Sequence, residues 1–336
     1  MRLLVGAALL VVASGCSGPA PAGSPEPPDL PPASETGSPA DPESAPPAAV
    51  PRGGPRIAFT RWTTDPDRPR LWTADSDGSD AAPVGRQEGW WPDWRPDHRR
   101  LVFDLTDSRG PQRIATIRPD GKGLRILTKG WGYHEAADYA PDGRTIVYAH
   151  SDVLQHHSDF ATSLWVMAAD GSGQRPLRLS DGGGDDTEPE FSPNGRRIVF
   201  MRYRHDAAAT TAIHVVKADG SGVRRLTPWL RKAEHPRWSP DGRTIIYNVE
   251  DRRNPTADSN GIWTVRASGG EPRQLLATTP ELHAFKPDYS PNGRWIVMGC
   301  TTPGQSSDDV CVMRPDGSGV TRILSGDEWE NHVVWD

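Results

Sequence analysis

Carboxylate and imidazole side chains recur at one fixed offset along this sequence. Glu188, His235 and His332 each stand three residues before an aromatic residue. Imidazole and carboxylate groups are ligands that suit transition metals. If repeated structural units bring equivalent positions together, these three side chains form a candidate site for a divalent metal ion.

The segments before six such aromatic residues carry further side chains able to bind or coordinate: Trp90, Trp91, His134, Glu135, His283 and Trp329. Three interpretations fit them. The first is a polar, hydrated channel mouth in which His and Glu are bonded to loop backbone. The second is a docking surface for a peptide or glycan that uses exposed tryptophans, Trp131 included, as anchors. The third is the metal site.

No familiar catalytic motif accompanies these residues. The sequence has no Gly-x-Ser-x-Gly elbow, no phosphate-binding glycine loop and no helical His-x-x-x-His spacing. We therefore assign no catalytic residue and expect no cofactor beyond the metal of the third interpretation.

A repeated sequence motif encodes the structural units that would position these side chains. DYAPDGRTIVY (138–148) recurs as EFSPNGRRIVF (190–200) and RWSPDGRTIIY (237–247), and in two further copies, with 45 to 52 residues between successive aromatics. A second phrase, such as LWVMAADGSG (164–173), runs in step with it. Short apolar runs bounded by Gly, Pro, Asp and Asn are strands. Four such strands per repeat of this length predict the blades of an all-β propeller. The Asp residues of the turns are expected to stabilise the turns, since a calcium loop needs more oxygen ligands at fixed offsets.

The two ends of the repeat region complete each other. The chain stops at Val333–Asp336, where a turn and second strand should follow, and Pro55–Phe59 matches that missing second strand. We therefore predict a six-bladed propeller of four-stranded antiparallel blades in which the termini share one blade, which leaves no open edge.

The phrase (W/Y/F)-S-P-(D/N)-G-R-x-I-x-(F/Y), followed by I-W-x-x-x-x-D-G-S-G and R-x-L-T, resembles the WD40-like PD40 repeat of TolB propellers over residues 56–336. The resemblance implies the fold and a general habit of binding. It departs from TolB in having no α/β domain before the propeller and in an N-terminus that resembles a lipidation signal, so the partner contacts of TolB are not carried over.

The first 16 residues have one positive charge, an apolar stretch and then Ser14-Gly15-Cys16. This pattern predicts a lipoprotein signal peptide with Cys16 as the lipid-bearing residue, and the alternative is an ordinary secreted protein cleaved nearby. Residues 17–55 contain 13 prolines and no aromatic residue, which predicts a disordered linker before the domain at 56–336. The expected location is extracytoplasmic, with the lipid on Cys16 as the membrane anchor.

The charge balance argues against nucleic acid as a partner, and the cysteines indicate a disulfide. The formal net charge is −6, and residues 56–336 hold 39 acidic against 36 basic side chains, without the basic excess of a nucleic-acid-binding domain. Cys300 and Cys311 fall on neighbouring expected strands, which favours a disulfide over two buried free thiols outside the cytoplasm.

Two functions follow from these observations. The first is a monomeric, lipid-anchored scaffold of the cell envelope that binds a protein or peptide, or a glycan, at the channel mouth. The alternative is a metal-assisted polysaccharide lyase or hydrolase with its site at the same mouth.

Overall fold

All regular structure in the described part of the chain is β-strand. The computed structural model describes residues 55–62, 68–106, 111–130, 132–152, 162–205, 210–229, 232–251, 259–302 and 307–336. These residues include no helix that is long and apolar enough to cross a membrane. The signal peptide, Cys16, Trp131 and almost all of the linker lie outside the described residues.

The strands are short, as the repeats predict, with one exception of 13 residues, β3. In chain order they are β1 (Arg56–Trp62), β2 (Arg70–Asp75), β3 (Ala82–Trp94), β4 (Leu101–Leu105), β5 (Arg113–Ile117), β6 (Arg125–Ile126), β7 (Tyr133–Tyr139), β8 (Thr145–Ser151), β9 (Ser163–Ala168), β10 (Arg175–Pro176), β11 (Asp185–Phe191), β12 (Arg197–Arg204), β13 (Thr210–Lys217), β14 (Arg224–Arg225), β15 (Ala233–Trp238), β16 (Thr244–Val249), β17 (Gly261–Arg266), β18 (Arg273–Ala277), β19 (His283–Tyr289), β20 (Ile296–Thr301), β21 (Asp309–Met313), β22 (Thr321–Leu324) and β23 (Trp329–Trp335).

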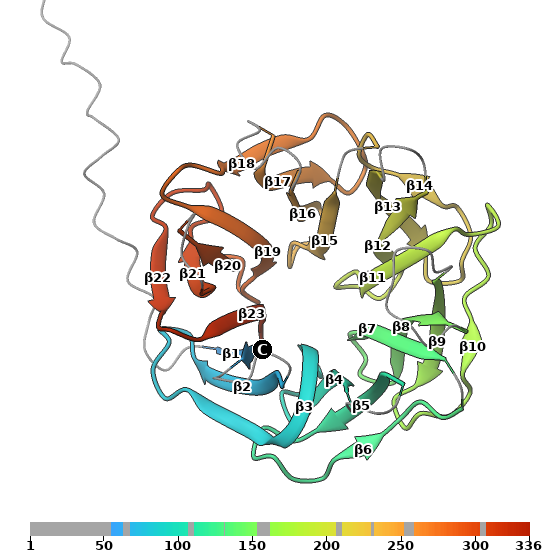
Figure 1. Cartoon of the computed structure of the whole chain (residues 1–336). Helices are drawn as coiled ribbons and strands as arrows, with labels where there is room; N and C mark the ends of the chain where they lie inside the picture. Colours follow the sequence, from blue (N-terminus) through green and yellow to red (C-terminus); the bar gives the residue numbers. More distant parts are fainter. Residues whose placement is uncertain are drawn as a thin grey trace, which may run out of the picture. The chain divides into compact units, whose positions relative to one another are not determined.

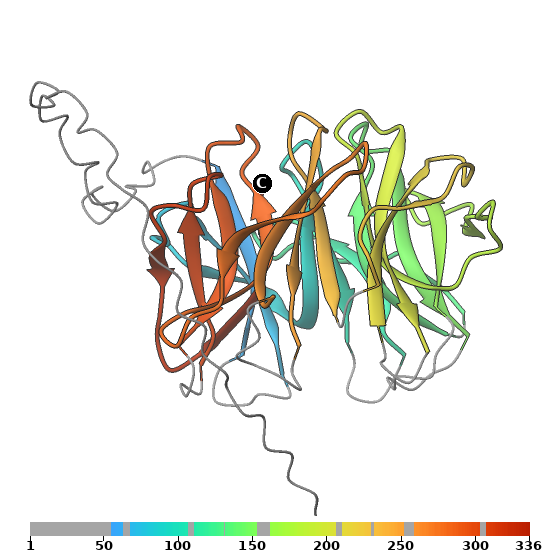
Figure 2. The ribbon, with the colours of Figure 1, turned by 90° about the horizontal axis from the view of Figure 1, so that it is seen from above.

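Antiparallel sheets follow one another around a central axis, as Figure 1 shows, and their strands run between the two faces of the ring (Figure 2). Four sheets have four strands each: β7–β10, β11–β14, β15–β18 and β19–β22. The innermost strands contact one another around the axis in the order β3, β7, β11, β15, β19 and β23.

The prediction of six separate four-stranded blades is wrong. The remaining strands form a single seven-stranded sheet, ordered β23-β1-β2-β3-β4-β5-β6. Strand β3 joins its two parts, because its residues from Ala82 to Glu88 include the partners of β2, while its residues from Gly89 to Trp94 include the partners of β4. Elsewhere a breaker separates the outer strand from the next inner strand, as Gly182 and Gly183 with positive φ do before β11. In β3 a glycine with positive φ, Gly85, coincides with a shift in the pairing register with β2 but does not end the strand.

The C-terminal strand closes the ring, as predicted. Strand β23 pairs antiparallel with β1 and places Trp335 opposite Ile57. The backbone N–H of Arg56 donates to the Asp336 carboxylate at 2.7 Å, and the backbone N–H of Asp336 donates to the Arg56 carbonyl at 2.8 Å. This pairing covers an edge of β1 that would otherwise be free.

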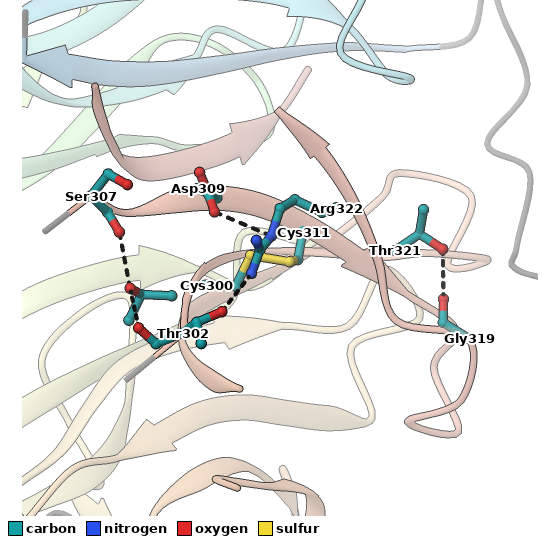
Figure 3. Close-up of a disulfide and its surroundings, with 9 residues drawn as sticks. Cys300, Thr302, Ser307, Asp309, Cys311, Gly319, Thr321 and Arg322 are labelled. Carbon is teal, nitrogen blue, oxygen red and sulfur yellow. Dashed lines mark hydrogen bonds and ion pairs between the residues drawn. A yellow bond between two sulfur atoms is a disulfide. The ribbon is translucent and has the colours of Figure 1, made fainter. Parts of the chain in front are cut away.

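The hydrophobic core lies between successive sheets. Five of the six repeat aromatics are at most 7% exposed, and Tyr289 is partly buried: Trp94, Tyr139, Phe191, Trp238, Trp335 and Tyr289. Cys300 on β20 and Cys311 on β21 form a disulfide, with their Cα atoms 5.8 Å apart (Figure 3). Both cysteines are nearly inaccessible and contribute to the core cluster between β16 and β20.

Candidate binding site at the channel mouth

Each inner strand contains a β-bulge at the same place. The pairing register shifts there, and the bulged residue takes a positive φ between 50° and 55° at Trp91, Ala136, Glu188, His235, Lys286 and His332. We call these six residues the mouth ring. Positive φ is uncommon for residues other than glycine, and such strained positions gather at functional sites.

The residue after the bulge is proline in four of the six strands: Pro92, Pro189, Pro236 and Pro287. A bulge leaves a backbone N–H without a ladder partner, so a residue that lacks this group fits there. The bulges re-aim the side chains of the mouth ring toward a common cavity of about 30 Å³. All six mouth-ring residues line it.

The indole of Trp91 lines this cavity and contacts three other members of the mouth ring. Its ring stacks on His235 at a centroid distance of 5.3 Å and an interplanar angle of 18°. On another side it lies 4.1 Å from the ring of His332. The Nζ of Lys286 is 5.3 Å from the centroid of the Trp91 ring, within the range of a cation–π contact. Trp91 therefore packs across the axis.

Lys286 contacts two residues of β23. Its Nζ lies 2.6 Å from Oδ1 of Asn331 and 2.7 Å from Nε2 of His332. An ammonium group only donates, so this Nε2 accepts and Nδ1 carries the proton of the neutral ring. Among the described residues the Nδ1 of His332 has no hydrogen-bond partner. His332 thus presents an unused donor.

Glu188 and His235 form the opposite wall. The Glu188 carboxylate accepts the backbone N–H of His235 at 2.7 Å, and its other oxygen is 3.4 Å from Nε2 of His235. The Nδ1 of His235 is 2.9 Å from Oδ1 of Asn248. Both His235 and Glu188 are therefore fixed in place by their neighbours.

Burial sets the charge states of the mouth. It raises the pKa of Glu188 to about 8, with Glu234 adding to the rise. It lowers the pKa of Lys286 to about 8, although the Glu188 carboxylate acts in the opposite direction. Burial, followed by the Lys286 ammonium, holds the pKa of His332 well below its usual value. Glu188 and Lys286, each with a pKa of about 8, can therefore gain or lose a proton close to neutral pH.

The structure does not place Glu188, His235 and His332 around one metal ion. The described ranges contain no group of three or more His, Cys, Asp and Glu side chains that could hold one. The Trp91 ring contacts both histidines, and the Lys286 ammonium takes the Nε2 of His332.

The other predicted residues lie at varying distances from this cavity. Trp90 is half-buried and packs edge-on against Trp62 at 4.6 Å, so it is not the exposed anchor expected. Glu135 accepts a hydrogen bond from the hydroxyl of Thr187. Trp329 is exposed at 48%.

Two predicted histidines stand apart from the mouth ring. His134 is 3% exposed, and its Nδ1 lies 3.2 Å from the Nδ1 of buried His150. His283 lies beside Phe285, with ring centroids 5.5 Å apart, and does not line the cavity.

Sequence reasoning missed the two other members of the mouth ring, Ala136 and Lys286. Both stand three residues before a repeat aromatic, so the same offset could have found them. It also missed a second ring one residue before those aromatics: Asp93, Asp138, Glu190, Arg237, Asp288 and Val334. All six of these residues line the inner part of the mouth cavity or the cavity on the opposite face.

Antiparallel sheets that succeed one another around an axis, with a cavity at their inner strands, define a β-propeller. The chain belongs to the PD40 family, the TolB β-propeller domain, whose family model matches residues 153–335.

One similar protein of known sequence is a peptidase of much greater length. The chain is 28% identical to the uncharacterized peptidase YuxL of Bacillus subtilis over 208 residues. This match covers 52% of this chain and 31% of YuxL. The chain thus spans less than a third of the length of that relative.

Two solved structures share the fold. TolB from Acinetobacter baumannii superposes with a TM-score of 0.66 at 21% identity, over 84% of this chain and 66% of that one. An oligogalacturonate lyase in complex with manganese superposes with a TM-score of 0.53 at 13% identity, over 80% of this chain and 73% of that one. At these identities the likeness concerns the fold alone.

Proposed function

We propose that the protein is a lipid-anchored, extracytoplasmic scaffold that binds a protein or peptide of the cell envelope at its channel mouth. The observation that carries this proposal is the mouth ring, in which one strained backbone geometry presents five types of side chain from the six inner strands. Variable side chains on a rigid frame suit recognition. Trp91 offers an aromatic surface, while Lys286 and His332 offer donors to a partner's acceptors.

The exposed indole of Trp329 extends this surface at the start of β23. Aromatic residues often dominate the binding energy of interfaces. A partner that contacts Trp329 while placing polar groups over the mouth ring would use both features.

Site-specific photocrosslinking tests the binding role. A photoreactive phenylalanine analogue in place of Trp329 should capture a defined envelope protein in intact cells. The same analogue in place of Glu271, an exposed residue in the turn between β17 and β18, is the matched control. Equal capture at both positions, or none at Trp329, would contradict docking at the mouth.

The anchor is tested separately. A Cys16→Ser variant should leave the membrane fraction and appear among soluble extracytoplasmic proteins, because lipid attachment to this thiol is the proposed link to the membrane. A variant that still sediments with membranes would remove the lipoprotein proposal and leave the binding proposal intact.

A second candidate is a lyase or hydrolase that acts on an anionic polysaccharide by acid–base catalysis. The observation that favours it is the presence of Glu188 and Lys286, both with a pKa of about 8, in one cavity, since acid–base catalysis requires groups that titrate near the working pH. Cleavage of oligogalacturonate by the purified protein, lost in a folded Glu188→Gln variant, would favour this candidate. A folded protein that cleaves no oligogalacturonate would contradict it.

A further inference from the structure

The outer strand β6 carries an exposed apolar and basic surface at the rim of the ring (Figure 1). Leu124 and Ile126 are 37% and 51% exposed, and among the described residues Trp329 is the other large hydrophobic side chain that is exposed. Lys122 and Arg125, which stand beside them in the chain, are exposed as well. We call Lys122, Leu124, Arg125 and Ile126 the rim patch.

The repeated fold does not require this surface. Serine or glycine takes the place of Lys122 in the other repeats: Ser79, Ser172, Ser221, Gly270 and Ser318. Proline or a polar residue takes the place of Ile126: Pro83, Pro176, Arg225, Gln274 and Arg322. The same turn and the same strand pairing form in all these repeats, so neither a lysine nor an exposed isoleucine is needed to build them.

Positive charge is concentrated around the rim patch. Residues 111–130 contain five basic side chains and one acidic side chain, Asp120, which pairs with Arg118 at 3.0 Å. The propeller as a whole has slightly more acidic than basic residues. Burial, followed by the nearby Arg125 guanidinium, lowers the pKa of Arg100. The rim patch is therefore a cationic area on a domain that is otherwise weakly acidic.

The rim patch projects from the ring and does not line a groove. None of its four residues lines the mouth cavity or the two cavities among the turns. Strand β6 has two residues, and so short an edge gives an added peptide strand little backbone to pair with. Projecting leucine and isoleucine side chains beside cations suit an anionic lipid surface, where the cations meet headgroups and the apolar side chains reach the acyl boundary.

The rim patch and the start of the propeller lie toward the same face of the ring. Strand direction alternates within a sheet, so the turn that holds Lys122 lies on the face of the Pro-Asp-Gly turns. Pro55 lines a cavity together with Asn292 and Asp316, which belong to turns of that face. The mouth ring lies toward the opposite face. A lipid surface at the rim patch would thus leave the mouth open.

We propose that the rim patch binds an anionic lipid surface, with Lys122 and Arg125 at the headgroups and Leu124 and Ile126 in the apolar boundary below them. A basic and apolar surface of this size binds weakly, and stable attachment takes two signals, so the patch supplements the lipid on Cys16. Release of the Cys16→Ser variant from cell membranes is therefore still expected. The turn face then rests on the membrane and the mouth faces away from it. Only this orientation rests on the proposed function.

Cosedimentation with lipid vesicles tests the proposal. The full chain carries Cys16→Ser, so that no lipid anchor contributes, and every variant is compared in this background. The vesicles contain phosphatidylcholine alone or an equal mixture of phosphatidylcholine and phosphatidylglycerol. We expect about tenfold stronger partitioning onto the anionic vesicles at low salt, and a smaller difference at high salt because salt screens exposed charges.

Variants locate the contact. Lys122→Ser and Ile126→Gln introduce residues that other repeats carry at the same positions, so the fold should survive. We expect each to reduce partitioning onto anionic vesicles about fivefold. Lys217→Ser is the matched control, because it removes the same charge from an exposed lysine in the corresponding turn of another repeat. It should change partitioning less than about twofold. Melting temperatures of all three variants verify folding.

Four results would overturn the proposal: no binding to vesicles, equal binding to both kinds of vesicle, unchanged partitioning in the folded Lys122→Ser and Ile126→Gln variants, or an equal loss in Lys217→Ser. Binding of an acetylated, amidated Glu-Val-Glu-Val-Glu peptide that is lost in Ile126→Gln, without binding to vesicles, would assign the patch to a partner strand instead. The anchor and the mouth are tested separately, by fractionation of Cys16→Ser cells and by crosslinking at Trp329.

Discussion

Two features recur around the ring, the Pro-Asp-Gly turns and the bulges of the inner strands, and they repeat in different ways. In the turns both backbone and side chain repeat: Asp142, Asn194, Asp241 and Asn292 each accept the backbone N–H two residues on, at 2.9 to 3.0 Å. In the bulges the backbone repeats while the side chains differ, from Trp91 to Ala136 to Lys286.

The difference separates structural from functional roles. A turn is stabilised by its own Asp or Asn side chain, so that side chain must recur. The conformation of a bulge is stabilised by the neighbouring strands and often by the following proline. It therefore does not depend on the side chain of the bulged residue, which can vary. We therefore expect changes in repeated positions to cost folding and changes in varied positions to cost binding.

The largest effect should come from removing the strand that closes the ring. Deleting Val333–Asp336 takes away three residues that are at most 5% exposed and uncovers an edge of β1. The loss should exceed the roughly 3–5 kcal/mol of one large core truncation. Thermal unfolding of the truncated chain measures it, and a melting temperature equal to that of the full chain would refute closure by β23.

A pair of tryptophans sharpens the contrast between core and mouth. Trp238 is 4% exposed, so Trp238→Ala should cost about 3–5 kcal/mol in the free energy of unfolding. Trp329 is 48% exposed, and Trp329→Ala should change stability by no more than about 0.5 kcal/mol. Urea denaturation compares them. Equal losses would show that Trp329 is structural.

A pH dependence is expected from the mouth ring. The folded-state pKa of Glu188, about 8, lies above the ordinary glutamate value of 4.5, so the folded chain retains a proton that the unfolded chain loses between these values. Stability therefore falls as pH rises through this window, by an amount on the order of a few kcal/mol. Glu188→Gln, which is always neutral, should lose most of this dependence, as urea titrations at pH 5 and pH 8 would reveal. A fall of unchanged size in the variant would assign it to other groups.

The smallest effect should come from one repeated turn. Asp241 accepts from the N–H of Arg243 and from the Ser239 hydroxyl at 2.7 Å, so Asp241→Ala should cost about 1 kcal/mol. Asp241→Asn keeps an acceptor and should recover most of that loss. If alanine and asparagine behave alike in thermal unfolding, the side chain does not stabilise the turn.

The sequence allowed the architecture to be predicted because turn chemistry and strand period are local properties. The repeat aromatics located each inner strand, and the match of Pro55–Phe59 to a missing second strand located the closure with β23. The continuity of β3 was not predictable, since it depends on which neighbour each half of the strand pairs with.

The site was only partly visible in the sequence. His235 and His332 stand three residues before a repeat aromatic, and both line the mouth cavity. The same offset, applied to every repeat, would also have identified Lys286. The position of Trp91 across the axis could not be foreseen, because it follows from side-chain packing between opposite strands. That ring, together with the Lys286 ammonium, is what separates the expected metal ligands.

The central claim is that the mouth ring serves binding. Lys286→Met tests it most directly, because it removes a half-buried ammonium whose pKa is lowered by burial and keeps an unbranched side chain. We predict a melting temperature at least equal to that of the wild type and about a tenfold loss of the partner captured at Trp329, measured by quantitative crosslinking. Undiminished capture by the folded variant would contradict the account.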